Sequence, residues 1–125
     1  MPGIAESGAD LGYRALVVDD EAALADVVAS YLKREHFEVT VCHTGVEALA
    51  VAREVDPDVV LLDLGLPGLD GFEVCKLIKS QDSSKHAEVI AMTGFPSQEN
   101  VDRIIECGAR ACLAKPLQIP ELLGE

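Results

Sequence analysis

Five short apolar runs, separated by longer amphipathic stretches, dominate the chain. The runs at 14–19 (RALVVD) and 58–63 (DVVLLD) have continuously apolar centres, and weaker runs lie at 39–42, 88–92 and 111–114. Continuous rather than alternating apolar character is typical of strands that are buried on both faces of a parallel sheet. We therefore predict five strands at these positions.

The stretches between these runs have the periodicity of helices. Apolar residues recur at i, i+3, i+4 and i+7, as on the buried face of an amphipathic helix. They are Leu24, Val27, Val28 and Tyr31, then Val74, Cys75 and Ile78, and finally Val101, Ile104 and Ile105. Helix start signals agree, because Thr44 with Glu47 forms a capping box, Asp70 with Glu73 resembles one, and Ser97 is placed to cap a later helix.

Strands and helices alternate along the chain, with short connections. An order of β-α repeated five times predicts an α/β fold, a doubly wound five-stranded parallel sheet with helices on both faces. We assign residues 1–13 to a flexible amino-terminal tail and residues 14–125 to a single domain. The final helix, at 117–125, is shorter than the others, so either the domain ends early or the chain is cut before a further segment.

Charge and composition narrow the class of protein. The formal net charge of −12 argues against direct binding to nucleic acid, which needs clustered lysine and arginine. No apolar run approaches the roughly 20 residues of a membrane span. The four cysteines form no CxxC pair and indicate reduced, buried thiols in a cytoplasmic protein. They are Cys42, Cys75, Cys107 and Cys112.

Polar residues follow the ends of four predicted strands. Asp19 and Asp20 end the first strand, Asp63 the third, Thr93 the fourth and Lys115 the fifth. Ligands of open parallel sheets bind outside the carboxyl ends of the strands, so we expect these side chains to converge at one edge. Each has an ordinary structural role when taken alone, such as a helix cap for Asp20, but their joint placement favours a functional site.

Three converging carboxylates repel one another, and a protein can relieve this by protonating one of them or by supplying a cation. Two unit charges roughly 4 Å apart repel by about 4 kcal/mol at an effective dielectric constant of about 20. Oxygen ligands favour Mg²⁺, which binds through one or two carboxylates together with phosphate oxygens. A carboxylate can also be the nucleophile that accepts a phosphoryl group. The sequence thus predicts Mg²⁺-dependent phosphoryl transfer to Asp63, in which Lys115 neutralises charge and Thr93 donates a hydrogen bond.

Four motifs carry a family resemblance. They are VVDDE at 17–21, VVLLDLGLPGLDG at 59–71, AMTG at 91–94 and LAKP at 113–116. In this order and spacing they resemble the response-regulator receiver domain of bacterial two-component signalling, a CheY-like domain. The resemblance implies a flavodoxin-like fold with strand order 2-1-3-4-5. It also implies a switch that takes a phosphoryl group from a sensor histidine kinase or a phosphotransfer protein, and that catalyses its own phosphorylation and slow dephosphorylation.

The resemblance assigns the phosphoacceptor and the metal ligands. Asp63 matches the phosphoacceptor and, together with Asp20, the carboxylates that bind Mg²⁺ directly. Asp19 matches the carboxylate that acts mostly through water. Gly65 matches a residue that lends only its backbone carbonyl to the metal, so the lack of a side chain is compatible with that role.

The resemblance also assigns the switch residues. Thr93 matches the hydroxyl that moves toward the phosphoryl group, and Lys115 matches the cation that pairs with it, with a cis peptide bond between Lys115 and Pro116. An aromatic residue usually stands three positions before this lysine, where the chain has Cys112. A thiol is too small to fill the same pocket. We therefore expect switching to proceed through the loop after Thr93 and the helix at 97–107, not through a rotating ring.

Two further positions bear on the lifetime of the phosphoryl group. Members of the family tune its hydrolysis with side chains two residues beyond the acceptor and two beyond the switch hydroxyl, which here are Gly65 and Phe95. Neither can orient an attacking water, and Phe95 is placed to cover part of the site. We expect a comparatively long-lived phosphoryl state.

Two other interpretations of the site compete with the phosphorylation switch. A phosphatase that forms an aspartyl phosphate uses a D-x-D pair, but Gly65 stands where the second acid is required. A pseudo-receiver that binds partners without phosphate needs a missing acidic or lysine position, and only the departure at Cys112 favours it. The expected surface for an output domain or a homodimer is formed by the fourth helix, the fifth strand and the fifth helix, around 97–107, 110–113 and the final segment.

Overall fold

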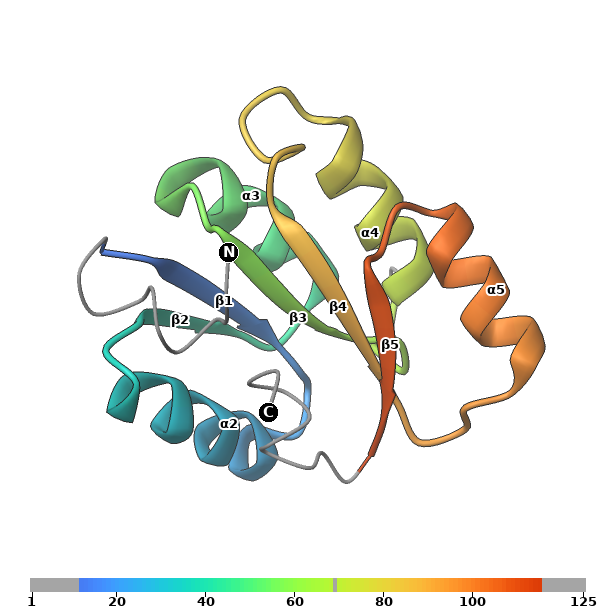
Figure 1. Ribbon diagram of the computed structural model, residues 1–125, viewed down its shortest axis with the longest axis horizontal. Coiled ribbons are helices and arrows are strands. Elements are labelled where there is room, and N and C mark those ends of the chain that lie inside the picture. Colours follow the sequence, from blue (N-terminus) through green and yellow to red (C-terminus); the bar gives the residue numbers. More distant parts are fainter. Residues whose placement is uncertain (1–11, 69, 116–125) are drawn as a thin grey trace.

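The computed structural model describes residues 12–68 and 70–115, which contain a parallel sheet of five strands (Figure 1). The strands lie in the order β2-β1-β3-β4-β5, and all neighbours are parallel. Their bounds are Arg14–Val18 (β1), Glu38–Cys42 (β2), Val59–Asp63 (β3), Glu88–Thr93 (β4) and Ala111–Ala114 (β5). The predicted doubly wound sheet and its strand order are confirmed.

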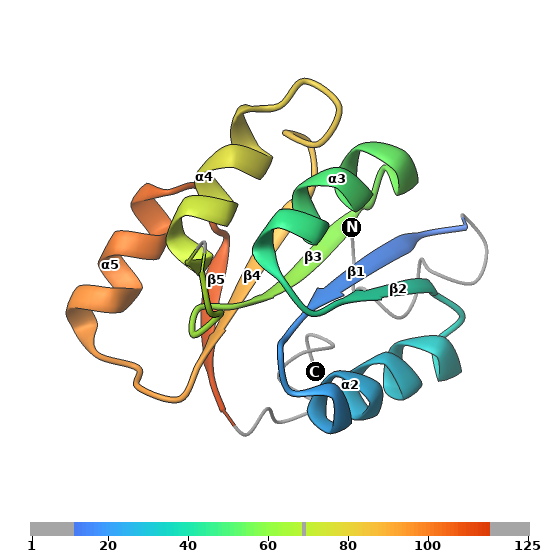
Figure 2. The same cartoon turned by 180° about the vertical axis from the view of Figure 1, so that it is seen from behind.

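Within the described residues, four helices cover the two faces of the sheet. They are α2 (Ala22–Arg34), α3 (Gly45–Val55), α4 (Gly71–Ser80) and α5 (Gln98–Glu106). The first, α2, lies on one face, and the other three lie on the opposite face (Figure 2). None of these four is long and apolar enough to cross a bilayer. Residues 1–11 of the expected tail, the expected cis bond to Pro116 and the expected helix at 117–125 lie outside the described residues.

Alternate strand residues form a separate apolar cluster on each face of the sheet. In β1, Leu16 and Val18 belong to the cluster under α3, α4 and α5, which also contains Ile78, whereas Ala15 and Val17 face α2. All five residues of β3 are buried. A strand covered on both faces has no solvent side, which explains its continuous apolar sequence.

The predicted helix starts are present as capping hydrogen bonds. The Thr44 side chain accepts a hydrogen bond from the backbone N–H of Glu47 at 3.1 Å, and Asp70 accepts one from Glu73 at 2.9 Å. Ser97 caps α5 in the same way. Because these caps satisfy N–H groups that have no partner within the helix, local chemistry fixes where these helices begin.

The buried faces of α2 and α5 differ from the predicted ones. Val27 and Tyr31 are exposed, and the buried stripe of α2 has the same spacing one residue later. It consists of Ala25, Val28, Ala29 and Leu32. In α5, Ile104 is fully buried but Ile105 is 44% exposed. The prediction of a buried side chain was wrong at these three exposed positions. In α2 the reason is that two alanines let the helix approach the sheet along a neighbouring stripe.

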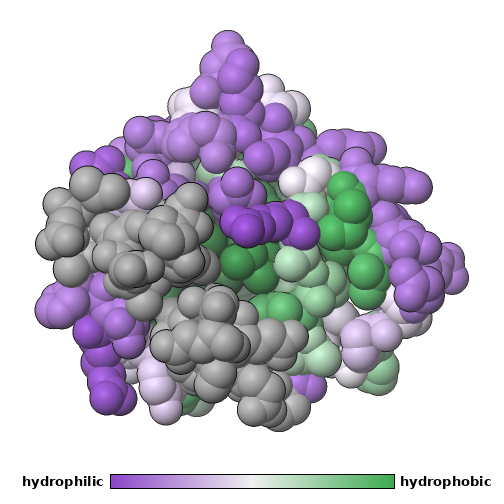
Figure 3. Space-filling model, in the orientation of Figure 1, coloured by the Kyte–Doolittle hydropathy of each residue, from purple (hydrophilic) through white to green (hydrophobic). Residues whose placement is uncertain are grey.

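The sheet face that carries α2 is covered by that helix only in part. Beyond α2, toward β4 and β5, apolar side chains are visible at the surface (Figure 3). Leu113 of β5 is one of the half-buried residues that pack at the margin of this cluster. Among the described helices, the opposite face has three to cover it and this face has one.

Gly71, the first residue of α4, is packed against the backbone that follows β3. An added Cβ would lie 2.6 Å from Leu64 Cα and 2.7 Å from the Asp63 carbonyl oxygen. We expect Gly71→Ala to lower the free energy of unfolding by about 1–3 kcal/mol, measured by urea denaturation, because the backbone must shift. Gly94→Ala is the matched control, since nothing lies within 4 Å of its added Cβ. Equal losses in the two variants would contradict this steric explanation.

Candidate functional site

The residues that were predicted to converge lie at one edge of the sheet. The β1–β3 register pairs the residue before Asp19 with the residue before Asp63. The β4–β5 register pairs Thr93 with the residue before Lys115. Strand register, rather than a long loop, therefore brings these four residues to the same end of the sheet.

Asp19, Asp20 and Asp63 form an acidic cluster in which one carboxylate oxygen from each lies within 4.8 Å of the others. Asp19 and Asp63 are 1% and 5% exposed, while Asp20 faces solvent. Burial raises the pKa of Asp19 above its ordinary value of 3.8, against the opposing hydrogen bonds from the Glu21 N–H and from Lys115. The folded protein thus holds the charged form of Asp19 at a cost in free energy.

The Lys115 ammonium lies between the two buried carboxylates. Its Nζ is 3.1 Å from Asp19 Oδ2 and 3.1 Å from Asp63 Oδ2, with Glu21 Oε1 at 3.8 Å. Burial by itself lowers the pKa of Lys115, but hydrogen bonds and charge from Asp63 and Asp19 outweigh it and raise that pKa. One ammonium offsets only part of the charge of three aspartates, so the cluster keeps a net negative charge.

Backbone N–H groups hold the other oxygens of the buried carboxylates. The N–H of Glu21 donates to Asp19 Oδ1 at 2.9 Å, and the N–H of Gly65 donates to Asp63 Oδ1 at 2.9 Å. Each of these two carboxylates is therefore bonded to a backbone group through one oxygen and to an ammonium through the other. Such bonds orient both groups before a ligand binds.

Thr93 is buried, and its hydroxyl is bonded to the loop that follows β4. Oγ1 accepts a hydrogen bond from the N–H of Phe95 at 3.0 Å. A hydroxyl that accepts in this way still has its own proton to donate. The Thr93 carbonyl also accepts the N–H of Lys115 at 2.8 Å, which ties the ends of β4 and β5 together.

A cavity of about 410 Å³ opens over the acidic cluster. Most of the residues that line it belong to the predicted site or to the motifs around it. Two that the sequence did not single out are Phe72 and Asn100. Phe72 and Asn100 lie in the first turns of α4 and α5, the helices that follow β3 and β4, and that position is the sequence signal that could have indicated them. Phe95 lines the rim but is 84% exposed, so its ring is not packed over the acceptor.

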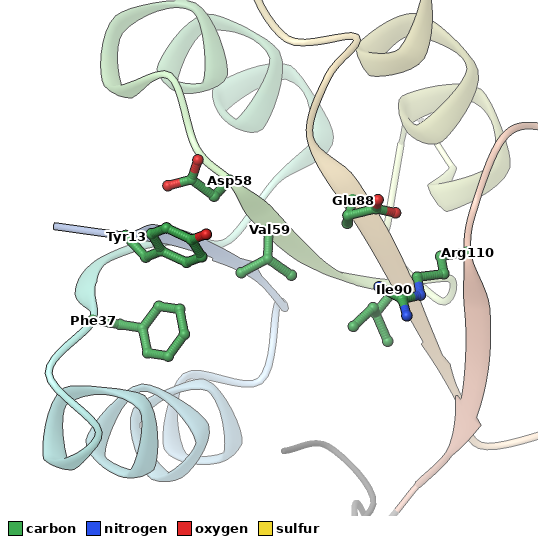
Figure 4. Close-up of a pocket in the computed structure, with 7 residues that line it drawn as sticks. All are labelled: Tyr13, Phe37, Asp58, Val59, Glu88, Ile90 and Arg110. Atoms are coloured by element: carbon green, nitrogen blue, oxygen red, sulfur yellow. The ribbon is translucent and has the colours of Figure 1, made fainter. Parts of the chain in front are cut away.

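A second cavity, of about 230 Å³, lies at the opposite edge of the sheet (Figure 4). The rings of Tyr13 and Phe37 meet edge to face on one side of it, with centroids 6.3 Å apart, and Glu88 and Arg110 lie on the other side. Its residues come from the amino ends of the strands. Because ligands of open parallel sheets bind at the carboxyl ends, the acidic edge is the candidate site.

The four cysteines are free thiols, of which Cys42 and Cys75 are buried and Cys107 and Cys112 are half-buried. Burial raises the pKa of the Cys42 thiol to about 12 and that of the Cys75 thiol to about 11, so both are protonated near neutral pH. Cys112 packs against the cluster under α3, α4 and α5. The prediction of buried thiols is thus confirmed at Cys42 and Cys75 and only in part at Cys107 and Cys112.

The donor set at the acidic edge fits a hard divalent cation. Its members are carboxylates, and the exposed Asp20 leaves one ligand open to a hydrated ion. Mg²⁺ takes oxygen ligands and usually keeps several waters. The arrangement can therefore hold such an ion beside the oriented carboxylate of Asp63, which is a potential nucleophile.

Comparison with known proteins identifies the family of this domain. The response regulator receiver domain family matches residues 15–125. The DNA-binding response regulator MtrA of Mycobacterium tuberculosis is 36% identical over 111 residues, which make up 89% of this chain and 47% of MtrA. The chain thus spans about half the length of this curated relative.

Two solved structures share the fold. A response regulator from Burkholderia pseudomallei with a phosphorylated aspartic acid, a calcium ion and citrate gives a TM-score of 0.82 at 26% identity, covering 88% of this chain and 64% of that one. The receiver domain of sensor histidine kinase PA1611 from Pseudomonas aeruginosa, with a magnesium ion in its active site cleft, gives 0.80 at 29% identity, covering 89% and 91%. Together with the family match over most of its length, these likenesses show that the chain belongs to the response regulator receiver domain family.

Proposed function

We propose that this receiver domain accepts a phosphoryl group on Asp63 in a Mg²⁺-dependent reaction. The observation that carries the proposal is the Asp63 carboxylate itself, which is buried, bonded to Lys115 and clustered with Asp19 and Asp20. The phosphorylated aspartic acid of the Burkholderia relative supports this assignment. We propose residues 14–125 as the extent of the domain.

The carboxylates of Asp19, Asp20 and Asp63 and the backbone carbonyl of Gly65 are the groups that we propose as Mg²⁺ ligands, with Asp19 acting mostly through water. When bound, the ion would supply positive charge to the phosphoryl oxygens. The hydrogen bond from the Glu21 N–H keeps the Asp19 carboxylate turned toward the cluster. The magnesium ion in the PA1611 receiver domain supports the choice of metal.

Each protein group has a defined part in the proposed transfer. A carboxylate oxygen of Asp63 attacks the phosphorus of a phosphohistidine, the P–N bond breaks and the leaving imidazole takes up a proton. Lys115, 3.1 Å from Asp63 Oδ2, is placed to pair with an oxygen of the transferred group. The Thr93 hydroxyl, which keeps its proton, is placed to donate to another oxygen. A sensor histidine kinase or a phosphotransfer protein is the proposed donor.

The proposed output is a protein contact rather than direct binding to DNA. MtrA is a DNA-binding regulator, but this chain spans only about half of its length. The net charge of −12 on this chain opposes contact with a phosphate backbone. We infer that the phosphorylated domain acts through an output domain or a second copy of itself, at the face formed by α5, β5 and the segment that follows. Four cysteines without a disulfide fit the proposed cytoplasmic location.

A receiver that binds partners without phosphate is the second candidate. It is favoured by one observation, the half-buried Cys112 in β5, where the family usually has an aromatic residue. The acidic, hydroxyl and lysine positions of the site are all present and converge, which favours phosphorylation. A phosphatase is disfavoured because Gly65 offers no second acid.

Asp63→Asn tests the phosphoacceptor directly. With Mg²⁺ and acetyl phosphate, a small acyl phosphate, we expect the wild type to gain the mass of one phosphoryl group by intact-protein mass spectrometry. The variant should gain none, because an amide is a poor nucleophile, and EDTA should prevent labelling of the wild type. Asp82→Asn is the matched control, since the Asp82 side chain is 98% exposed, and should label normally. Equal labelling of wild type and Asp63→Asn would overturn the assignment.

Asp19→Asn is expected to separate stability from function. In EDTA at neutral pH the variant should have a free energy of unfolding higher by about 1 kcal/mol, because it removes a buried charge near Asp63. Its amide oxygen can still accept the Glu21 N–H. Added Mg²⁺ should stabilise the variant less than the wild type. Urea denaturation with EDTA and with Mg²⁺ measures both effects. A variant that is less stable than the wild type in EDTA would show that the ion pair with Lys115 outweighs the cost of burial.

The side chains beside the acceptor predict slow hydrolysis of the phosphoryl group. Gly65 has no side chain to bind water, and Phe95 at the rim has only an apolar ring. A Cβ at Gly65 would lie 3.5 Å from Asp63 Oδ1, an ordinary contact. We therefore expect Gly65→Asn, whose amide can orient water, to shorten the phosphoryl half-life by about tenfold in a phosphate-release assay. Decay of the wild type within a few seconds would count against this prediction.

A further inference from the structure

Few buried contacts anchor α5 to the core. Ile104 is its one buried residue, whereas α4, which is of similar length, buries four. An element with few buried apolar contacts has low local stability. The polar contacts at the two ends of α5 therefore have a large influence on its position.

The carboxyl half of α5 is held against α4. The Arg103 guanidinium lies 4.0 Å from the centroid of the Phe72 ring, a cation–π contact. One turn further along both helices, the Cys75 thiol donates to the carbonyl of Cys107 at 3.5 Å. We call these two contacts the α4–α5 seam, and they fix one end of α5 to a well-buried helix.

The amino end of α5 is instead connected to the phosphorylation site. Asn100 Nδ2 donates to the Phe95 carbonyl at 3.2 Å, and the N–H of the same Phe95 donates to Thr93 Oγ1 at 3.0 Å. The backbone N–H of Asn100 donates to Ser97 Oγ, which is the capping hydrogen bond that fixes the first turn of the helix. Phe95 is thus bonded on one side to the site hydroxyl and on the other side to α5.

We propose that Asn100 is the positioning residue that transmits phosphorylation of Asp63 to α5. The inference rests on the proposed function, in which the Thr93 hydroxyl turns toward the phosphoryl group. That movement either draws the Phe95 backbone with it or releases the Phe95 N–H. In both cases the Phe95 carbonyl takes a new position, and Asn100 carries the change into α5. The α4–α5 seam is the fixed end about which the helix shifts.

The relay depends on the chemistry of the Asn100 amide and not on a ring in β5. The Phe95 carbonyl is an acceptor, so the side chain that reaches it must donate a hydrogen bond, as an amide can and a carboxylate cannot. The path runs through the loop after β4 and does not include Cys112. A small residue at that position therefore leaves the connection between the site and α5 intact.

The test compares amide NMR spectra of the full chain with and without Mg²⁺ and saturating beryllofluoride, a phosphoryl mimic. In the wild type we expect changes around 93–95 and along 101–106. In Asn100→Ala the changes around 93–95 should persist, while those at 101–106 fall to about half or less. Asn100→Asp keeps the size of the side chain but removes the N–H group that donates to the Phe95 carbonyl. A negative charge in the first turn stabilises a helix, so Asn100→Asp does not unfold α5. If this variant also loses the changes at 101–106, the loss cannot come from an unfolded helix.

Gln98→Ala is the matched control. Its amide lies in the same turn but donates to Asp102 at 2.8 Å, so its response should equal that of the wild type. Changes of wild-type size at 101–106 in both Asn100 variants would overturn the relay, as would an equal loss in Gln98→Ala. A wild type that shows no change around 93–95 with the mimic would instead overturn the proposed function.

Discussion

The Lys115 ammonium lies 3.1 Å from two carboxylates at the carboxyl ends of different strands, and the acidic edge of the sheet depends on this pairing. Asp19 and Asp63 are almost fully buried, and two buried carboxylates side by side favour protonation of one of them. An ammonium between them lets both stay charged. The lysine follows β5, two strands away from β3, so the site can form only in a sheet whose register is already correct.

The same arrangement attracts a cation and, when no cation is bound, costs free energy because charged carboxylates are buried. The raised pKa of Asp19 shows that burial outweighs the favourable contacts with Lys115 and the Glu21 N–H. A binding site that is oriented in advance commonly reduces the stability of the free protein. Backbone bonds to Asp19 and Asp63 hold the ligands in place, and the uncompensated negative charge provides the attraction for a divalent ion.

The fold and the acidic edge could be predicted from the sequence because they follow from strong local signals. A strand buried on both faces, such as β3, must be continuously apolar, and residues at parallel strand ends must meet at one edge. The buried face of α2 was missed because two alanines shift the contact by one residue, leaving Val27 and Tyr31 exposed. The first turn of a helix was a signal that could have placed Asn100 near the site, but its proposed role depends on the path of the loop after β4, which the sequence does not encode.

The carboxyl half of α5 is held against α4, whereas its amino end is bonded to the loop after β4. This difference bears on how a receiver can signal with Cys112 in β5. A ring that moves inward couples a site to a surface through volume, so it requires a large side chain and a pocket that can accept it. A chain of hydrogen bonds couples a site to a surface through bond geometry, because a donor must move with its acceptor to keep the distance and angle of the bond. The bonds from Thr93 through Phe95 to Asn100 have this directional character, and they end on a helix with one buried residue. A weakly anchored helix responds to a small displacement that a fully packed helix would resist.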